Sequence, residues 1–292
     1  MTEKTALINH PSGKSMILIT GASGGLGKAF AVECASRGWD LFLTDLKGES
    51  LVVLAKSLGS TYGVSVLAQA CDLTDPASRS ALFEDIQAGG RQFWGLINVA
   101  GIDFEGPFYQ QSRQQIRTIL RLNIEGTLEM THAMLAFRDP RAPFRIINVA
   151  SLAAFYPMPV KATYAASKRF LLDFSLALRN ELSETGATVT VLCPAGLPTT
   201  ADCIQAINAQ GLLGQLTTQN IGDVANQTLD AALKGQAVYI PGGLNRFIQA
   251  AGGLLPTPWL VHLIGRRWKA AQQKGPAGEN DGFTLATARQ GR

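Results

Sequence analysis

The sequence predicts an α/β fold in which a doubly wound parallel sheet is covered by helices on both faces. From residue 16 onward, short apolar runs alternate with longer segments of helical periodicity. Apolar, β-branched runs of this kind suit strands that are buried on both faces. No repeat and no long polar linker divides residues 16–242. We therefore expect a single domain built on one sheet.

The expected strands and helices alternate along the chain. The first strand is MILIT (16–20), which ends at a glycine cluster and leads into a helical pattern at 25–38. A second helical pattern, 49–58, separates the next two strands, DLFLTD (40–45) and VSVLAQACD (64–72). The remaining strands are WGLINVAG (94–101), FRIINVAS (144–151) and ATVTVLCPAG (187–196).

Charge is distributed unevenly between the sheet domain and the end of the chain. We place the domain at residues 15–243, after an N-terminal extension at residues 1–14. Residues 1–242 hold 19 Lys or Arg and 20 Asp or Glu, whereas residues 243–292 hold 7 and 2. The net charge is therefore −1 before residue 243 and +5 from there on. No cluster of Arg and Lys is interleaved with aromatic residues, so we expect no nucleic-acid partner.

The chain changes character after residue 243. Residues 244–274 read as an apolar and then basic C-terminal extension, and residues 275–292 as a disordered tail. The apolar part is too broken for a membrane span, which needs about 20 mostly apolar residues. Two hypotheses fit it: an interfacial helix on anionic lipid, or a cap over the substrate cleft or a neighbouring subunit. The lipid hypothesis rests on Trp259, Leu260, Leu263, Ile264 and Trp268 beside Arg266, Arg267 and Lys269.

Cysteine and histidine show no spacing that suits a disulfide framework or a metal site. The cysteines are Cys34, Cys71, Cys193 and Cys203, and the histidines are His10, His132 and His262. Unpaired cysteines are typical of reduced thiols inside a cell. The first residues carry no apolar signal core. We expect a cytoplasmic protein without a metal.

The glycine-rich stretch after the first strand predicts a nucleotide-binding turn. TGASGGLG places Gly21, Gly25 and Gly27 between an apolar strand and an amphipathic helix. Glycines here permit a tight turn and allow backbone N–H groups to approach a pyrophosphate, which the helix N-terminus also attracts. The spacing is Gly-x-x-x-Gly-x-Gly, which differs from the G-x-G-x-x-G of many dinucleotide-binding folds. Because the glycine turn lies between a strand and a helix, we nevertheless expect a Rossmann-like fold.

Asp45 indicates which dinucleotide binds. It closes the second strand, eighteen residues past Gly27, close to the spacing of about 20 expected for a ribose-binding acid. A carboxylate there accepts hydrogen bonds from the adenosine ribose hydroxyls and repels a 2′-phosphate. We therefore expect NAD(H) in preference to NADP(H).

Tyr164 and Lys168 form a candidate acid–base pair. A free tyrosine has a pKa of about 10 and is a poor base at neutral pH. Residues four apart share one face of a helix, so the Lys168 cation is expected to stabilise the Tyr164 phenolate and lower the pKa of that side chain. Ser151, thirteen residues earlier, is expected to donate a hydrogen bond to a substrate oxygen that gains negative charge.

In motifs and in their order, residues 15–243 resemble the short-chain dehydrogenase/reductase family. TGASGGLG is similar to the TGxxxGxG cofactor turn of the family, and YAASK to its Tyr-x-x-x-Lys motif. NVAG resembles the family's NNAG, with Val99 in place of the second Asn. CPAGLPTT (193–200) resembles its Pro-Gly segment, which meets the nicotinamide, with Ala195 inserted between Pro and Gly.

The resemblance implies a set of site residues. As a catalytic set it implies Asn123, Ser151, Tyr164 and Lys168, with the asparagine orienting a water in a proton relay and the lysine also binding the nicotinamide ribose. As a cofactor-binding set it implies Gly21, Ser23, Gly25, Leu26, Gly27, Asp45, Asp72, Leu73, Asn98, Ala100, Gly101, Tyr164, Lys168, Pro194 and Gly196. Asp72 and Leu73 would contact adenine, and members of the family are often homodimers or homotetramers.

The expected function is an NAD-dependent oxidoreductase that interconverts a secondary alcohol and a ketone. Apolar residues near the expected site favour a bulky hydrophobic substrate, with a hydroxysteroid as one candidate. They are Phe155, Tyr156 and Met158, and, in the segment expected to cover the site, Ile204, Ile207, Leu212, Leu213 and Leu216. If the protein is an enzyme, the alternative function is that of a β-ketoacyl thioester reductase. If it is not an enzyme, the alternative is a cofactor-sensing binding protein without activity.

Overall fold

The computed structural model describes residues 15–199, 201–209 and 211–272. The expected N-terminal extension and the expected disordered tail lie outside these residues. Seven parallel strands form one sheet in the order β3-β2-β1-β4-β5-β6-β7. They are β1 (Ser15–Thr20), β2 (Leu41–Asp45), β3 (Val66–Ala70), β4 (Gln92–Asn98), β5 (Phe144–Val149), β6 (Ala187–Leu192) and β7 (Val238–Tyr239).

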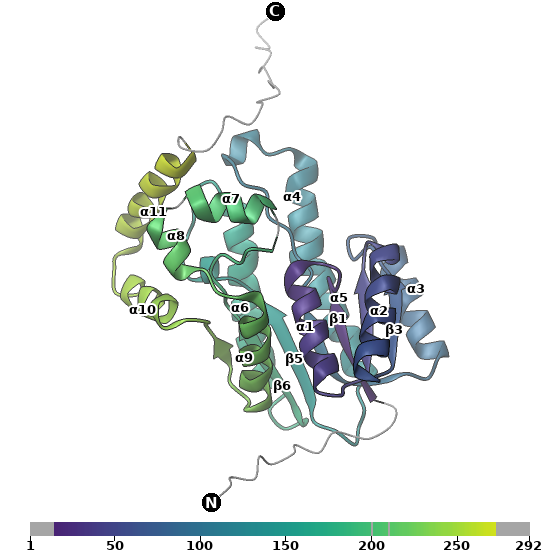
Figure 1. Cartoon of the computed structure of the whole chain (residues 1–292). Coiled ribbons are helices and arrows are strands. Elements are labelled where there is room, and N and C mark those ends of the chain that lie inside the picture. The colour runs from purple at the N-terminus through teal and green to yellow at the C-terminus, as the bar shows by residue number, and fades with distance from the viewer. Residues whose placement is uncertain (1–14, 200, 210, 273–292) are drawn as a thin grey trace, which may run out of the picture.

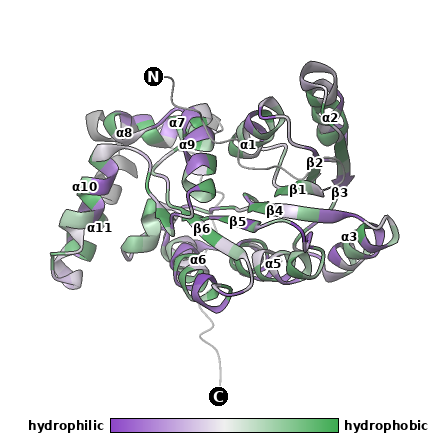
Figure 2. Ribbon diagram, turned by 90° about the horizontal axis from the view of Figure 1, so that it is seen from below, coloured by the Kyte–Doolittle hydropathy of each residue, from purple (hydrophilic) through white to green (hydrophobic). Residues whose placement is uncertain are grey.

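Helices cover both faces of the sheet, as expected for a doubly wound, Rossmann-like fold (Figure 1). One face carries α1 (Gly25–Ser36), α2 (Gly48–Tyr62) and α9 (Ile221–Leu233), and the other carries α3 (Pro76–Ala88), α5 (Thr127–Ala136) and α6 (Ala162–Glu181) (Figure 2). Shorter elements are η1 (Phe108–Gln110), α4 (Arg113–Ile119), η2 (Leu120–Gly126), η3 (Leu152–Phe155), α7 (Ala201–Ala209) and α8 (Leu212–Thr217). The chain continues into α10 (Gly243–Gly252) and α11 (Thr257–Gln272).

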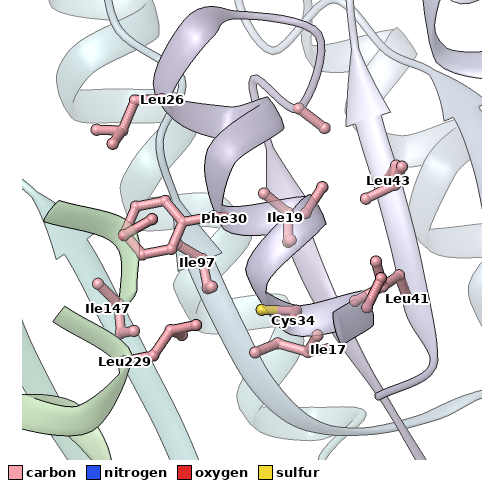
Figure 3. Close-up of a cluster of buried hydrophobic side chains, with 14 of the residues drawn as sticks. Ile17, Ile19, Leu26, Phe30, Cys34, Leu41, Leu43, Ile97, Ile147 and Leu229 are labelled. Carbon is pink, nitrogen blue, oxygen red and sulfur yellow. The ribbon is translucent and has the colours of Figure 1, made fainter. Parts of the chain in front are cut away.

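Side chains of successive strand residues enter the two layers alternately. Ile17 and Ile19 belong to the cluster that contains Phe30 of α1 and Leu229 of α9 (Figure 3). Leu18, between them, belongs to the opposite cluster with residues of α3 and α5. Both faces of the strand are buried, which explains why its sequence is continuously apolar and does not alternate.

The winding direction reverses beside β1, because β1 lies between β2 and β4. In open α/β sheets, ligands bind outside the carboxyl ends of the strands at such a switch point. The glycine turn follows β1 and the NVAG segment follows β4, so the fold places both at this point.

The C-terminal extension packs against the segment between η3 and α6. The Tyr156 hydroxyl lies 2.8 Å from the carbonyl oxygen of Ile248 and 2.9 Å from that of Gln249, both in α10. Gly265 of α11 lies against Pro159, whose Cγ would be 3.2 Å from an added Cβ. These contacts place α10 and α11 against the part of the chain between Ser151 and Tyr164. Among the described residues, no helix is long and apolar enough to cross a bilayer.

Candidate active site

The turn after β1 brings three glycines into close contact with other backbone. Gly21 has a φ of +63°, and a Cβ there would lie 2.9 Å from Ala100 Cα. A Cβ on Gly27 would overlap the carbonyl oxygen of Gly21, and one on Gly25 would lie 3.0 Å from Thr199 Cα. None of the described side chains caps the N-terminus of α1, which follows Gly24. This uncapped helix end in a glycine cradle fits the pyrophosphate of a dinucleotide.

Two carboxylates are fixed by hydrogen bonds along the same edge of the sheet. The Ser23 amide donates to Asp45 Oδ2 at 3.0 Å, and the Lys47 amide donates to Asp45 Oδ1 at 3.2 Å. Asp72, after β3, accepts from the amide and the hydroxyl of Thr74 at 2.8 and 2.7 Å. Asp45 is therefore held directly beside the glycine turn, which suits the ribose-binding role expected of it.

The side chains of Leu26, Leu73 and Asn98, all in the expected cofactor-binding set, are buried. Leu26 and Leu73 belong to the two core clusters. Asn98 is 3% exposed, and its amide group donates to Thr131 Oγ1 at 3.0 Å and to Asn148 Oδ1 at 2.9 Å. These side chains stabilise the edge of the site, so a contact with a cofactor would have to come from their backbone.

The NVAG segment links the glycine turn to the catalytic residues. The Thr20 hydroxyl accepts hydrogen bonds from the amides of Val99 and Ala100 at 3.1 and 3.2 Å. A Cβ on Gly101 would lie 3.1 Å from Lys168 Nζ and 3.3 Å from Asn123 Oδ1. Glycine at 101 thus allows the lysine and the asparagine to approach this backbone together.

Asn123 lies in the π-helical turn η2, which interrupts the helix between α4 and α5. Its side-chain oxygen accepts from the Ile102 amide at 2.8 Å, and its amide group donates to Ile102 O and to Ser167 Oγ, both at 3.0 Å. The buried side chain thus joins the segment after β4 to α6. Asn123 lies in the site as expected, and its side chain holds the segment beside Lys168.

Ser151, Tyr164 and Lys168 meet beside the carboxyl end of β5. Ser151 follows this strand; its hydroxyl accepts from the Ala153 amide at 3.1 Å and lowers the pKa of the Tyr164 phenol. Lys168, on the same face of α6, is 4% exposed, donates to Val149 O at 2.9 Å and lies 5.7 Å from the centroid of the Tyr164 ring. The arrangement can place a hydroxyl donor, a phenol and a cation around one substrate oxygen.

Burial outweighs charge in setting the pKa of both central groups. Burial raises the pKa of Tyr164 to about 12; the Asp103 carboxylate adds to this, whereas the Ser151 hydrogen bond and the Lys161 cation oppose it. Burial lowers the pKa of Lys168 to about 8, against the opposing effects of Asp103 and Cys193. The lowered tyrosine pKa expected from the sequence therefore does not hold in the protein without cofactor, because desolvation disfavours the phenolate.

The segment after β6 crosses the glycine turn. Pro194 O accepts from the Leu152 amide at 2.7 Å, and Gly196 lies against Ile207 of α7. Thr199 is the residue that lies against Gly25. Within the segment expected to cover the site, Ile207 is buried, whereas Ile204 and Leu216 are exposed. The side chains of Leu212 and Leu213 lie outside the described part of the chain.

Sequence reasoning missed three residues that the fold brings to the site: Thr199, Lys161 and Asp103. Thr199 lies within the expected Pro-Gly segment but was not assigned a role, and Lys161 is only three residues before Tyr164. No local pattern indicates that Asp103, 58 residues away, binds Lys161. Within the described residues, no group of His, Cys, Asp and Glu could hold a metal ion.

The sheet topology, the glycine cradle and the Ser-Tyr-Lys set together define a nucleotide-binding oxidoreductase. The sequence model of the short chain dehydrogenase family matches residues 15–209, and the chain belongs to this family. It is therefore an oxidoreductase that uses a nicotinamide dinucleotide and acts on alcohol or carbonyl groups.

The names of individual similar proteins refer to different substrates. Sulfoacetaldehyde reductase 2 of Chromohalobacter salexigens is 33% identical over 181 residues, which are 61% of this chain and 71% of that protein. The bulky-bulky ketone specific alcohol dehydrogenase of Comamonas testosteroni is 26% identical with a TM-score of 0.68, over 82% of this chain and 93% of that one. A short-chain dehydrogenase of Sphingobium yanoikuyae, solved with NADPH, is 28% identical with a TM-score of 0.68, over 91% and 99%.

Proposed function

We propose that the protein interconverts a secondary alcohol and a ketone with NAD(H), and that Tyr164 is the acid–base residue. The observation that carries this proposal is the convergence of the Ser151 hydroxyl and the buried Lys168 cation on the Tyr164 phenol. The nicotinamide supplies or accepts the hydride. In the reducing direction Tyr164 donates its proton to the carbonyl oxygen, Ser151 donates a hydrogen bond to the same oxygen, and Lys168 stabilises the phenolate that remains.

NAD(H) is the proposed cofactor because Asp45 lies at the turn, where a carboxylate repels a 2′-phosphate. The Sphingobium relative was solved with NADPH, so the preference needs a direct comparison. We expect a larger kcat/KM with NADH than with NADPH. Asp45→Ser should reduce or reverse this ratio, whereas Asp72→Ser should leave it within about threefold. An unchanged ratio in Asp45→Ser would contradict the assignment.

A bulky hydrophobic ketone, such as a steroid ketone, is the proposed substrate class. Phe155, Tyr156 and Met158 are half-buried between Ser151 and Tyr164, and the Comamonas relative is named for ketones of this kind. The test is NADH oxidation with three groups of compounds: steroid and diaryl ketones, small sugars, and β-ketoacyl thioesters. Fastest turnover of the thioesters would favour the alternative reductase, and no turnover with NADH or NADPH would favour the cofactor-sensing protein.

The remaining proposals concern where the protein acts and with what. We place the protein in the cytoplasm. We propose that it forms a homodimer or a homotetramer, and light scattering after gel filtration would measure this oligomeric state.

We also propose that α10 and α11 contact anionic lipid, because Phe247, Trp259 and Leu263 are 68%, 76% and 61% exposed, and this segment carries the excess positive charge. Phosphatidylglycerol vesicles should retain the full chain but not the Trp259→Ser/Leu263→Ser variant. Equal retention of both would remove the lipid proposal.

A further inference from the structure

A cluster of three charged residues lies next to Tyr164. Lys161 Nζ is 2.5 Å from Asp103 Oδ2 and 3.1 Å from Glu105 Oε2. It also lies 5.8 Å from the centroid of the Tyr164 ring, almost the same distance as Lys168 Nζ. Lys161, Asp103 and Glu105, here called the Lys161 cluster, thus bring a second cation to the ring together with two carboxylates.

The backbone that carries Lys161 is held in an unusual conformation. Among the residues that the structure describes, Val160 is the one non-glycine residue with a positive φ, +62°. This region is sterically unfavourable for a β-branched residue and persists only where the surroundings enforce it. The Gly106 amide donates to the Val160 carbonyl oxygen at 2.8 Å. The same two segments are therefore joined by backbone at Val160 and by ion pairs at Lys161.

The cluster does not have the composition of a receptor for anions. With one lysine and two carboxylates its formal charge is −1, and Lys161 is already paired with both carboxylates. Asp103 Oδ1 is buried, with no hydrogen-bond partner in the described part of the chain. The two carboxylates thus exceed the one cation of the cluster, and one Asp103 oxygen makes no hydrogen bond within the described residues.

The groups that act on Tyr164 come from several elements. Burial has the largest effect on its pKa; among charged and titratable groups, Asp103 and Cys203 raise the pKa and Lys161 lowers it. Lys168 faces the ring from α6, the Ser151 hydroxyl lowers the pKa of the phenol, and Glu105 is paired with Lys161. Asp103 also raises the pKa of Lys168. One carboxylate therefore acts on both residues of the acid–base pair.

We propose that Lys161 and Asp103 are positioning residues whose ion pair, supported by Glu105 and the Val160 backbone, sets the balance of charge on Tyr164. The proposal rests on the proposed function of Tyr164. Neither residue has to touch the substrate, and the effect is electrostatic. Removing Asp103 should make Tyr164 ionise more readily, and removing the Lys161 charge should make it ionise less readily.

The direct test is the ionisation of Tyr164 in the protein without ligand. Tyrosine labelled with ¹³C at Cζ reports phenolate formation, and Tyr164→Phe assigns the signal. At pH 10.5 we expect Asp103→Asn to increase the ionised fraction about fivefold. Lys161→Met should decrease it, and Lys161→Arg should restore the wild-type value. Arg169→Met is the matched control, because Arg169 pairs with Asp173 on the exposed side of the same helix.

Opposite shifts in Asp103→Asn and Lys161→Met, with no shift in Arg169→Met, would support the proposal. The proposal would be overturned if both variants shifted the ionised fraction of Tyr164 in the same direction, or if both gave the same fraction as Arg169→Met. If circular dichroism shows that Asp103→Asn fails to fold, Glu105→Gln replaces it and should also increase the ionised fraction; an unchanged or smaller fraction would overturn the proposal. Turnover of the ketone panel tests the proposed function independently, because the titration needs neither cofactor nor substrate.

Discussion

At the scale of single residues, Lys168 is buried and Tyr164 is half-buried, and burial moves their pKa values in opposite directions. Each shift favours the neutral form, because a low-dielectric surrounding disfavours charge. The protein without cofactor therefore holds the phenol protonated, which is the form that donates a proton to a ketone. Oxidation of an alcohol requires the phenolate, so we expect its rate to increase with pH.

Lys168 should leave a measurable signature in stability. Its pKa is about 8 in the folded protein, below the usual 10.5. Between these values the unfolded chain binds more protons, so this group makes the protein more stable as the pH rises. From pH 8 to 10, the wild type should gain about 2 kcal/mol in free energy of unfolding relative to Lys168→Met. Urea unfolding at several pH values measures this difference, and a constant difference would contradict the shift.

Ser151, Tyr164 and Lys168 could be predicted because they lie close in sequence and their chemistry is complementary. The ion pair of Lys161 with Asp103 could not, since it depends on the path of the segment after β4. The hydrogen bonds of the Asn98 side chain with Thr131 and Asn148 could not be predicted either, because they depend on the pairing of β4 with β5. Contacts within one turn of helix can be read from a sequence, whereas contacts between segments require the fold.

At the scale of elements, the first turn of α1 depends on glycine at position 27. A Cβ there would overlap the Gly21 carbonyl oxygen. We expect Gly27→Ala to lower the free energy of unfolding by about 2 kcal/mol and to weaken NADH binding more than tenfold. Gly59→Ala in α2 is the matched control, because its added Cβ meets Val64 O at an ordinary 3.4 Å. NADH fluorescence titration measures the binding, and equal affinities of the two variants would argue against the glycine cradle.

Six of the seven strands could be predicted, since apolar runs buried on both faces leave a clear signal, whereas β7, with only two half-buried residues, was missed. The expected strand 64–72 is shorter in the structure, Val66–Ala70, because the chain leaves the sheet before it reaches Asp72. The π-helical turn around Asn123 could not be predicted, because a change in hydrogen-bond pattern does not alter the apolar periodicity of a short segment.

At the scale of the whole molecule, Tyr156 connects the C-terminal extension to the site. Its hydroxyl reaches two carbonyl groups of α10, and Gly252 lies against its ring. Tyr156→Phe loses a hydrogen bond of about 1 kcal/mol, so amide exchange in α10 should become about fivefold faster while the sheet is unaffected. Tyr62→Phe, an exposed tyrosine in α2, is the control. Unchanged exchange in α10 would show that other contacts hold the extension.

The sequence left the position of this extension open, because its apolar residues suit a lipid surface and a protein surface alike. The structure resolves part of the ambiguity, since α10 packs on the segment that leads to Tyr164. Several apolar side chains of α10 and α11 nevertheless stay exposed. The extension can therefore contact the body of the protein and a further surface at the same time.

The central claim is that Tyr164 transfers the proton in a nicotinamide-dependent reduction. The most direct measurement is NADH oxidation by the wild type and by Tyr164→Phe, with the best ketone of the panel, together with the NADH dissociation constant of each. We expect Tyr164→Phe to reduce kcat by about 10³-fold and to change the dissociation constant less than threefold. A variant that keeps its turnover while binding NADH normally would contradict the claim.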